Sequence, residues 1–291
     1  MIKVSTLQTD IKWADPIANQ QAVESALLAS APADLYVLPE MWDTGFMASE
    51  SLKAEEKQLS TVNYQLSIAF MQRMAQRLNA AIAGSIAYQE PSHLSPFTSH
   101  ISHQTSDLSP QPSALYNRLF FVTPEETFFY DKRHLFSYAG EDKTFTAGEQ
   151  PVVVEWRGVK FLLQVCYDLR FPCFSRNKLL QPSDLSLQPS YLYDAVIYVA
   201  NWPESRRRVW DILLQARALE NQCFVIGVNR VGDDPNCHYN GGTVIIDAKG
   251  KTLASVADDT VGIATAELDM QSLQTFREKF PVLRDADVIS N

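Results

Sequence analysis

The chain has 291 residues, of which 46% are hydrophobic and 20% are charged, and these proportions are typical of a globular protein with a substantial core. This length suits one large α/β domain or two small ones. The net charge of −9 argues against non-specific binding to nucleic acid or to an anionic membrane, and no apolar stretch approaches the roughly 20 residues of a membrane span.

Strand and helix patterns alternate along the first half of the chain. Met1 leads directly into the strand-like Ile2–Leu7, which leaves no room for a signal peptide. Asp15-Pro16 then predicts a helix start with proline at the first helical position. The apolar residues of this helix are Ala22, Val23, Ala26 and Leu27. The next elements are a strand over Leu35–Glu40, a helix around Asn63–Leu78 with Leu66, Phe70, Met74 and Leu78 spaced by four, and strands over Ala81–Tyr88, Ala114–Thr123 and Glu126–Lys132.

The second half of the chain continues this alternation. Two hairpin-like pairs span Val152–Val165, with a turn at Arg157-Gly158, and Gly242–Val256, with a turn at residues 247–250. Between these pairs, a helix over about Ser205–Asn221 separates two strands, Ala195–Ala200 and Cys223–Asn229. The alternation predicts a large mixed α/β domain.

Cys166 stands where a buried strand ends. The apolar run Val159–Val165 has strand character, and Pro172 soon ends the extended path. A cysteine on a sharp turn after such a strand is raised above the sheet and becomes reachable, which is the geometry of a nucleophile elbow. Most free cysteines are buried and inert, so this position needs support from other residues.

Two other predicted strand ends carry the ionisable groups that a thiol nucleophile needs. Glu40 ends one strand and Lys132 ends another. An unperturbed thiol has a pKa of about 8.5, so only a few per cent is ionised at pH 7. A neighbouring ammonium favours the thiolate, and a neighbouring carboxylate accepts the proton. We therefore expect Cys166 to attack an amide with Glu40 as base, while Lys132 and the backbone N–H of Tyr167 stabilise the oxyanion.

The motifs around these residues resemble the carbon–nitrogen hydrolase (nitrilase) superfamily. They are LPEMWDTGF at Glu40, YDKRHLF at Lys132 and CYDLRFP at Cys166, with further matches in NWPESRRRVWDILLQARALEN from Asn201 and GGTVIIDAKGK from Gly241. The resemblance covers nearly the whole chain. It implies an α/β fold, a four-layer αββα sandwich of two mixed sheets flanked by helices, as a single domain over residues 1–291. Members commonly pair through the flanking helices, so we expect a homodimer.

Within the superfamily the chain looks most like an omega-amidase, which hydrolyses the terminal amide of small 2-oxo acids through a cysteine thioester. The resemblance also implies a fourth polar residue, Glu141, at the spacing where a second glutamate orients the lysine and the substrate amide. Other reactions stay open, on N-carbamoyl amines, nitriles or peptide-like amides, as does a non-catalytic scaffold. No phosphate-binding glycine loop, dinucleotide fingerprint or HExxH motif is present, so we expect no cofactor and no metal.

Six residues near the predicted site are candidates for binding the substrate. They are Phe46, Tyr167, Arg170, Asn201, Trp202 and Arg206. Phe46 and Trp202 lie in loops after strand ends, where ligands bind in such folds, although either ring could be ordinary core. Arg170 and Arg206 could hold a substrate carboxylate, because a planar guanidinium suits bidentate binding. Arg170 could instead pair with Asp168.

Two segments are longer than the corresponding connections of compact relatives. Residues 90–113 are rich in Ser, Pro, His and Thr and predict a polar surface loop, with metal binding by His93, His100 and His103 as the alternative. Residues 181–193 begin soon after the Cys166 turn, so this segment could line or cover the pocket.

The remaining cysteines lack the support that the motifs give to Cys166. Cys223 lies in a strand-like stretch and is expected in the core, and Cys173 has no assigned role. Cys237 beside His238 is a weak zinc signal without a second pair of ligands. Four cysteines in a chain of this length suggest a reducing compartment, so we expect a cytoplasmic protein.

Overall fold

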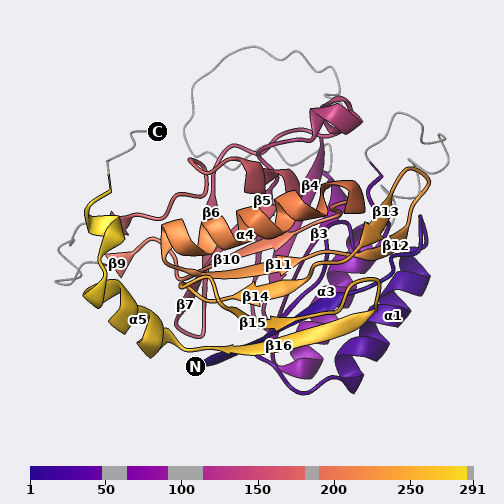
Figure 1. Cartoon of the computed structure of the whole chain (residues 1–291). Coiled ribbons are helices and arrows are strands. Elements are labelled where there is room, and N and C mark those ends of the chain that lie inside the picture. Colours follow the sequence, from indigo (N-terminus) through magenta and orange to yellow (C-terminus); the bar gives the residue numbers. More distant parts are fainter. Residues whose placement is uncertain (48–63, 91–113, 181–189, 287–291) are drawn as a thin grey trace, which may run out of the picture.

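The structure, a computed structural model, describes residues 1–47, 64–90, 114–180 and 190–286 (Figure 1). Nearly all of the two predicted loops, including His93, His100 and His103, lies outside the described residues. At the end of the second loop, Tyr191 and Tyr193 are buried and do not line the pocket that contains Cys166. This end of the segment therefore belongs to the core and does not cover the pocket.

Two six-stranded mixed sheets form the centre of the molecule. The first has the strand order β16-β1-β2-β3-β4-β5, with β1 (Ile2–Gln8), β2 (Leu35–Val37), β3 (Ala81–Gln89), β4 (Leu115–Val122), β5 (Thr127–Asp131) and β16 (Gly262–Leu268). The second has the order β15-β14-β11-β10-β7-β6, with β6 (Val152–Trp156), β7 (Val159–Val165), β10 (Ala195–Val199), β11 (Phe224–Val228), β14 (Val244–Ile246) and β15 (Thr252–Ser255).

Helices cover the outer faces of both sheets (Figure 1). They are α1 (Pro16–Ala29) and α3 (Tyr64–Leu78) on the first sheet and α4 (Arg207–Asn221) on the second. Val23 and Phe70 join the first two helices to their sheet in one apolar cluster. Trp210 and Leu214 join α4 to the second sheet in another. The four-layer αββα sandwich expected from the resemblance is confirmed.

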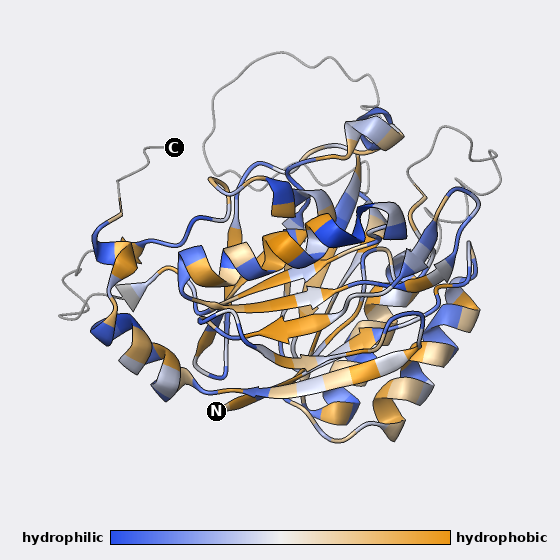
Figure 2. Cartoon of the chain, in the orientation of Figure 1, coloured by the Kyte–Doolittle hydropathy of each residue, from blue (hydrophilic) through white to orange (hydrophobic). Residues whose placement is uncertain are grey.

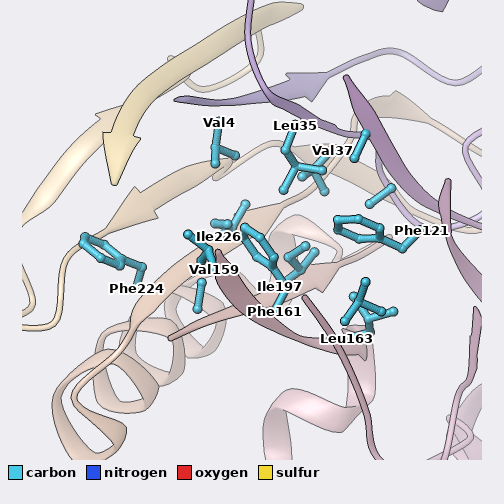
Figure 3. Packing of buried hydrophobic residues seen from close by; sticks show 14 of the residues in the cluster. Val4, Leu35, Val37, Phe121, Val159, Phe161, Leu163, Ile197, Phe224 and Ile226 are labelled. Carbon is cyan, nitrogen blue, oxygen red and sulfur yellow. The ribbon is translucent and has the colours of Figure 1, made fainter. Parts of the chain in front are cut away.

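The core between the two sheets is continuous and apolar. Figure 3 shows Val37 and Phe121 of the first sheet facing Phe161 and Ile197 of the second. The rings of Phe121 and Phe161 lie 5.8 Å apart between centroids. Strands β10 and β11 are buried on both faces, because one face meets the first sheet and the other meets α4. They are therefore apolar along most of their length, as their colour in Figure 2 shows.

The two sheets share one pattern of strand direction. From β16 to β5, and from β6 to β15, neighbouring strands are antiparallel, parallel, parallel, antiparallel and antiparallel. Each sheet thus contains three adjacent parallel strands, β1-β2-β3 and β7-β10-β11. Ligands of open α/β sheets bind beyond the carboxyl ends of such strands. The segments after β2, β7 and β10 carry Glu40, Cys166 and Asn201.

One sequence-based expectation about these elements is wrong, and two apolar residues of the predicted helices are exposed. The strand expected to reach Glu40 ends at Val37, and the chain turns at Met41, whose φ is 42°. On α3, Leu66 is 58% exposed, because a row of exact fours rotates by about 40° per step around a helix of 3.6 residues per turn. On α1, Ala22 is exposed.

Several further elements were not anticipated from the sequence. They are β16, α5 (Met270–Lys279), the pairs β8 (Leu179–Leu180) with β9 (Ser190–Tyr191) and β12 (Val231–Asp233) with β13 (His238–Asn240), and the short 3-10 helices η1 (Ser137–Ala139), η2 (Glu141–Lys143), η3 (Cys166–Arg170), η4 (Glu204–Arg206) and η5 (Val282–Arg284). Among the described residues, no helix is long and apolar enough to cross a membrane.

Candidate active site

Three charged side chains form one cluster without solvent exposure. Lys132 Nζ lies 2.9 Å from Glu40 Oε1 and 2.8 Å from Glu141 Oε2. Glu40 comes after β2, Lys132 directly follows β5, and Glu141 begins η2. The structure therefore brings together three of the four residues for which a catalytic role was expected.

Cys166, the fourth, is the first residue after β7. Its φ of 45° lies in the left-handed region, which costs a residue with a side chain roughly 1–2 kcal/mol. The chain thereby turns sharply out of the strand and into η3. The elbow geometry expected from the sequence is present. Its side chain lines a cavity, and the Glu40 carboxylate is near enough to raise the pKa of its thiol.

Asp168 connects this turn to the segment after β5. Its Oδ2 accepts hydrogen bonds from the Val165 N–H at 2.9 Å and the Tyr130 hydroxyl at 2.8 Å. Its Oδ1 accepts from the His134 N–H at 3.0 Å and lies 2.8 Å from His134 Nδ1. The buried carboxylate is thus fully occupied, and the alternative that it pairs with Arg170 is wrong.

The charges of the cluster stabilise one another. Burial lowers the pKa of Lys132, but the Glu141 and Glu40 carboxylates more than offset this and raise it above its ordinary value, so the side chain stays a cation. Burial raises the pKa of Glu141, and Lys132 acts against that rise. With both carboxylates ionised, the three side chains carry a net charge of −1.

Burial and this net negative charge both favour the protonated form of the Cys166 thiol. Burial and the charge of Glu40 raise its pKa well above the ordinary value, and Lys132 offsets only part of the rise. Lys132 by itself favours the thiolate, but Glu40 and Glu141 already balance its charge. Free ionisation of the thiol would bring the group to −2. Transfer of its proton to Glu40 leaves the charge unchanged, so the arrangement favours transfer within this pair.

Two asparagines hold Glu40 in place. Asn117 Nδ2 donates to Glu40 Oε1 at 2.8 Å, and the backbone N–H of Asn201 donates to Oε2 at 2.8 Å. Asn201 Nδ2 also donates to the backbone carbonyl of Glu40 at 2.7 Å. Both carboxylate oxygens therefore have fixed donors, which set the orientation of the Glu40 side chain.

A cavity of about 400 Å³ has Cys166 in its wall. All six candidates for substrate binding line it, and the role of each stays a prediction: Phe46, Tyr167, Arg170, Asn201, Trp202 and Arg206. The rest of the lining is Lys132, Phe136, Tyr138, Ala139, Pro203, Asn236, Cys237 and Tyr239. The wall is thus mostly apolar, and Lys132, two arginines and two asparagines are among its charged and polar groups. Such a cavity suits a small ligand with an apolar body and a charged end.

The two cavity arginines rest on aromatic rings. The Arg170 guanidinium lies 5.2 Å from the centroid of the Trp202 ring, and that of Arg206 lies 5.2 Å from the centroid of Phe136. Within the described part of the chain, neither has an acidic partner. Arg207, by contrast, is paired with Asp211 and with Asp258. Arg170 and Arg206 are therefore the arginines available to a ligand in this cavity.

Sequence reasoning missed Asn117 and one side of the cavity. Asn236, Cys237 and Tyr239 come from the β12–β13 hairpin, which follows the parallel strand β11. The rule that ligands lie beyond the ends of parallel strands pointed to Asn201 after β10, and it would have pointed to this hairpin as well. Asn117 lies inside β4 and carries no such signal.

Two of the other cysteines and one ion pair of α4 have ordinary structural settings. Cys223 is buried in the core, as expected, and Cys173 is exposed. Arg217 Nη1 lies 2.8 Å from Glu220 Oε1, three residues further along α4, and the two form a structural ion pair. In the regions that the structure describes, no group of three or more His, Cys, Asp or Glu side chains could hold a metal ion.

Comparisons with known proteins agree with this geometry. The family model described as carbon–nitrogen hydrolase matches residues 3–278. Omega-amidase YafV of Escherichia coli strain K12 is 40% identical over 288 residues, which cover 98% of this chain and 97% of that protein. A 2-oxoglutaramate amidase of Bacillus subtilis is 31% identical, with coverage of 97% and 96%.

A solved structure shows the same fold over the full length. It is the crystal structure of XC1258 from Xanthomonas campestris, described as a CN-hydrolase superfamily protein with an arsenic adduct in its active site. It is 33% identical, superimposes with a TM-score of 0.82, and covers 100% of this chain and 98% of its own.

Proposed function

The chain belongs to the carbon–nitrogen hydrolase family, and we propose that it hydrolyses the terminal amide of a small substrate that also bears a carboxylate, of the 2-oxoglutaramate or 2-oxosuccinamate type. The products would be the acid and ammonia. The observation that carries this proposal is the buried Glu40–Lys132–Glu141 cluster against Cys166, in a cavity that also presents two arginines without acidic partners. The omega-amidase and 2-oxoglutaramate amidase relatives support the same substrate class.

The first half of the reaction forms a thioester. Glu40 takes the thiol proton of Cys166 as the sulfur attacks the amide carbon, and the carbonyl oxygen becomes an oxyanion. The Lys132 ammonium and the backbone N–H of Tyr167 are the hydrogen-bond donors that stabilise this oxyanion in our proposal. When the intermediate collapses, the carbon–nitrogen bond breaks and the nitrogen takes the proton from Glu40, so ammonia leaves and Glu40 is again a carboxylate.

The second half of the reaction hydrolyses this thioester. Glu40 takes a proton from water as the water oxygen attacks the thioester carbon. The carbon–sulfur bond then breaks, and the sulfur of Cys166 takes the proton back from Glu40. Each half moves one proton out to Glu40 and back, so the net charge of the cluster returns to −1 after each step. Because Glu40 takes the thiol proton during the attack, a protonated resting thiol is compatible with turnover.

The arginines account for the other end of the substrate. A carboxylate that enters a mostly apolar cavity must be paired, because an unpaired buried charge costs several kcal/mol. Arg170 and Arg206 both line the cavity and carry no acidic partner among the described residues. Their stacking on Trp202 and Phe136 holds the guanidinium planes in place, which reduces the entropy lost on binding.

The test compares a charged with an uncharged substrate. Arg170→Met and Arg206→Met should each raise KM for a 2-oxo acid omega-amide by about 10- to 100-fold and change KM for a short aliphatic amide much less. Arg208→Met is the matched control, because Arg208 belongs to the same arginine run and is exposed. Equal losses on both substrates would show that Arg170 and Arg206 support the fold instead.

A second assay tests the reaction class. Release of ammonia is measured from omega-amides of 2-oxo acids, N-carbamoyl amines and nitriles at equal concentration. We expect the omega-amides to have the highest kcat/KM. Faster turnover of a carbamoyl amine or a nitrile would move the chain to another branch of the family, and no turnover of any compound would indicate a non-catalytic scaffold.

We also propose a homodimer formed through the helices that flank the sandwich. Ile212 and Leu219 of α4 are 53% and 52% exposed and lie seven residues apart on one face, which supports an apolar contact there. Light scattering should give twice the chain mass, and Leu219→Glu should reduce it to one chain. A wild-type monomer at micromolar concentration would contradict this proposal.

A cytoplasmic location also remains a prediction, which cell fractionation tests.

A further inference from the structure

Asn117 lies within β4 and is fully buried beside the charged cluster. Its Nδ2 donates one hydrogen bond to Glu40 Oε1 at 2.8 Å and another to Glu141 Oε1 at 2.9 Å. Its backbone carbonyl accepts from the N–H of Lys132 at 3.0 Å. One asparagine therefore contacts all three members of the cluster.

The contacts form a closed arrangement of donors and acceptors. Lys132 Nζ donates to the same two oxygens, at 2.9 Å from Glu40 Oε1 and 3.0 Å from Glu141 Oε1. Each Oε1 thus receives two hydrogens, one from the ammonium and one from the Asn117 amide. Two carboxylates in one dry site repel each other, and donors placed between them are what allows both to stay ionised.

The orientation of the Asn117 amide follows from its neighbours. With the amide reversed, its oxygen would face two carboxylate oxygens, which is repulsive. In the orientation that donates to them, Oδ1 is buried without a hydrogen-bond partner among the described residues. An orphaned buried acceptor is unfavourable, so this residue is not explained by local stability alone. The compensating contacts are those with Glu40 and Glu141.

Glu40 Oε1 is saturated by Asn117 and Lys132, which leaves Oε2 for the thiol. The Asn201 N–H donates a hydrogen bond to one lone pair of Glu40 Oε2, and the second lone pair of this oxygen remains free. We propose that Asn117 is a positioning residue that holds Glu40 and Glu141 side by side as carboxylates and directs the free lone pair of Glu40 Oε2 toward the Cys166 thiol. This inference rests on the proposed amidase chemistry.

The experiment follows the pH dependence of the site. Four titratable side chains share it, namely Glu40, Glu141, Lys132 and Cys166, and they titrate as one unit. Hydrogen bonds to a carboxylate favour its charged form. Their loss in Asn117→Ala should therefore move the acid limb of the pH profile of kcat/KM to higher pH, by about one unit or more. The value of kcat/KM at its plateau should fall by about 10- to 100-fold. Asn117→Ser keeps one hydroxyl donor and should shift less.

A substrate-independent readout separates this inference from the proposed function. The rate of iodoacetamide addition to Cys166, followed by mass spectrometry across the acid range, also depends on Glu40 as base. Its acid limb should shift upward in Asn117→Ala by the same amount as that of kcat/KM. If the wild type turns over no amide but the alkylation limb still shifts, the proposed function fails and the role of Asn117 stands.

The matched control is Asn177→Ala. Asn177 is also a buried asparagine, and its Nδ2 donates to the carbonyls of Tyr193 and Asn221, away from the cluster. This variant should lose stability and leave the acid limb in place. Three results would overturn the proposal: an unshifted limb in Asn117→Ala, an equal shift in Asn177→Ala, or failure of both Asn117 variants to fold, which would assign the residue to the fold.

Discussion

Replacement of Glu40 by glutamine separates its two effects on Cys166, which have opposite signs. The substitution keeps the size of the side chain but removes a proton acceptor and one negative charge. Without the base, turnover should fall by about 10²- to 10⁴-fold. Without the charge, the thiol should ionise more readily, because Glu40 is the largest charge contribution that raises its pKa. The variant should therefore contain a better-ionised but less effective nucleophile.

The size of the second effect follows from the charges around the thiol. In the wild type, Glu40, Glu141 and Lys132 sum to −1, and in Glu40→Gln they sum to zero. Two unit charges about 4 Å apart interact by about 4 kcal/mol at an effective dielectric constant of 20. Since one pKa unit corresponds to about 1.4 kcal/mol, the thiol pKa should fall by up to about three units.

The assay measures both effects on one protein. Ammonia release gives turnover, and the alkaline rise of Cys166 alkylation with iodoacetamide gives the ionisation of the thiol. Trypsin separates Cys166, in the peptide Phe161–Arg170, from Cys173, in the next peptide. Cys173 is exposed and serves as the internal reference. Glu141→Gln is the control, because it makes the same charge change while Glu40 remains available as base.

Two outcomes would refute this reasoning. Turnover of Glu40→Gln within tenfold of the wild type would show that Glu40 is not the base. If the alkaline rise of Cys166 alkylation stays in place or moves to higher pH, the net charge of the cluster does not control the ionisation of the thiol. We expect the rise to move to lower pH in both Glu40→Gln and Glu141→Gln, with the larger loss of turnover in the first.

Four further substitutions test other parts of the structure. Cys166→Ala should abolish ammonia release and leave the melting temperature near that of the wild type, and Lys132→Ala should lower kcat by at least about 10²-fold through loss of an oxyanion donor. Burial raises the pKa of Asp43 to about 6, above its unfolded value, so its ionisation destabilises the fold as pH rises from about 4 to about 6. Asp43→Asn should therefore gain up to about 2–3 kcal/mol in urea unfolding at pH 8, and this gain should vanish at pH 4. Gly227→Ala places a Cβ 2.5 Å from Leu214 Cδ1 and should lower the free energy of unfolding by about 1–3 kcal/mol. An unchanged free energy of unfolding would contradict the close packing of α4 on β11.

Features encoded over a few consecutive residues could be read from the sequence. Asp15 caps α1 because its carboxylate accepts a hydrogen bond from the Ala18 N–H, and the proline after it begins the helix. The strand ends that carry Lys132 and Cys166 were recognisable because an apolar run stops at a charged or reactive residue within motifs that resemble one family. Such signals are local, so they survive without knowledge of the neighbours in space.

Features that depend on residues distant in the chain needed the folded structure. Asn117 is 77 residues from Glu40 and 24 from Glu141, and nothing near it in sequence indicates that it bridges the two. The Arg170–Asp168 pairing also looked reasonable locally, but Tyr130 and His134 occupy Asp168 from another strand end.

The protonation of Cys166 shows the physical reason most clearly. From the sequence, we expected Lys132 to favour the thiolate of Cys166 and Glu40 to accept its proton. In the structure, Glu40 and Glu141 both contact that lysine, and the net charge around the thiol is negative. A pKa is set by the sum of burial and all nearby charges, and that sum exists only when strands from both sheets have come together. The sequence therefore indicates which residues are expected to react, whereas the packing of the two sheets sets their charge state.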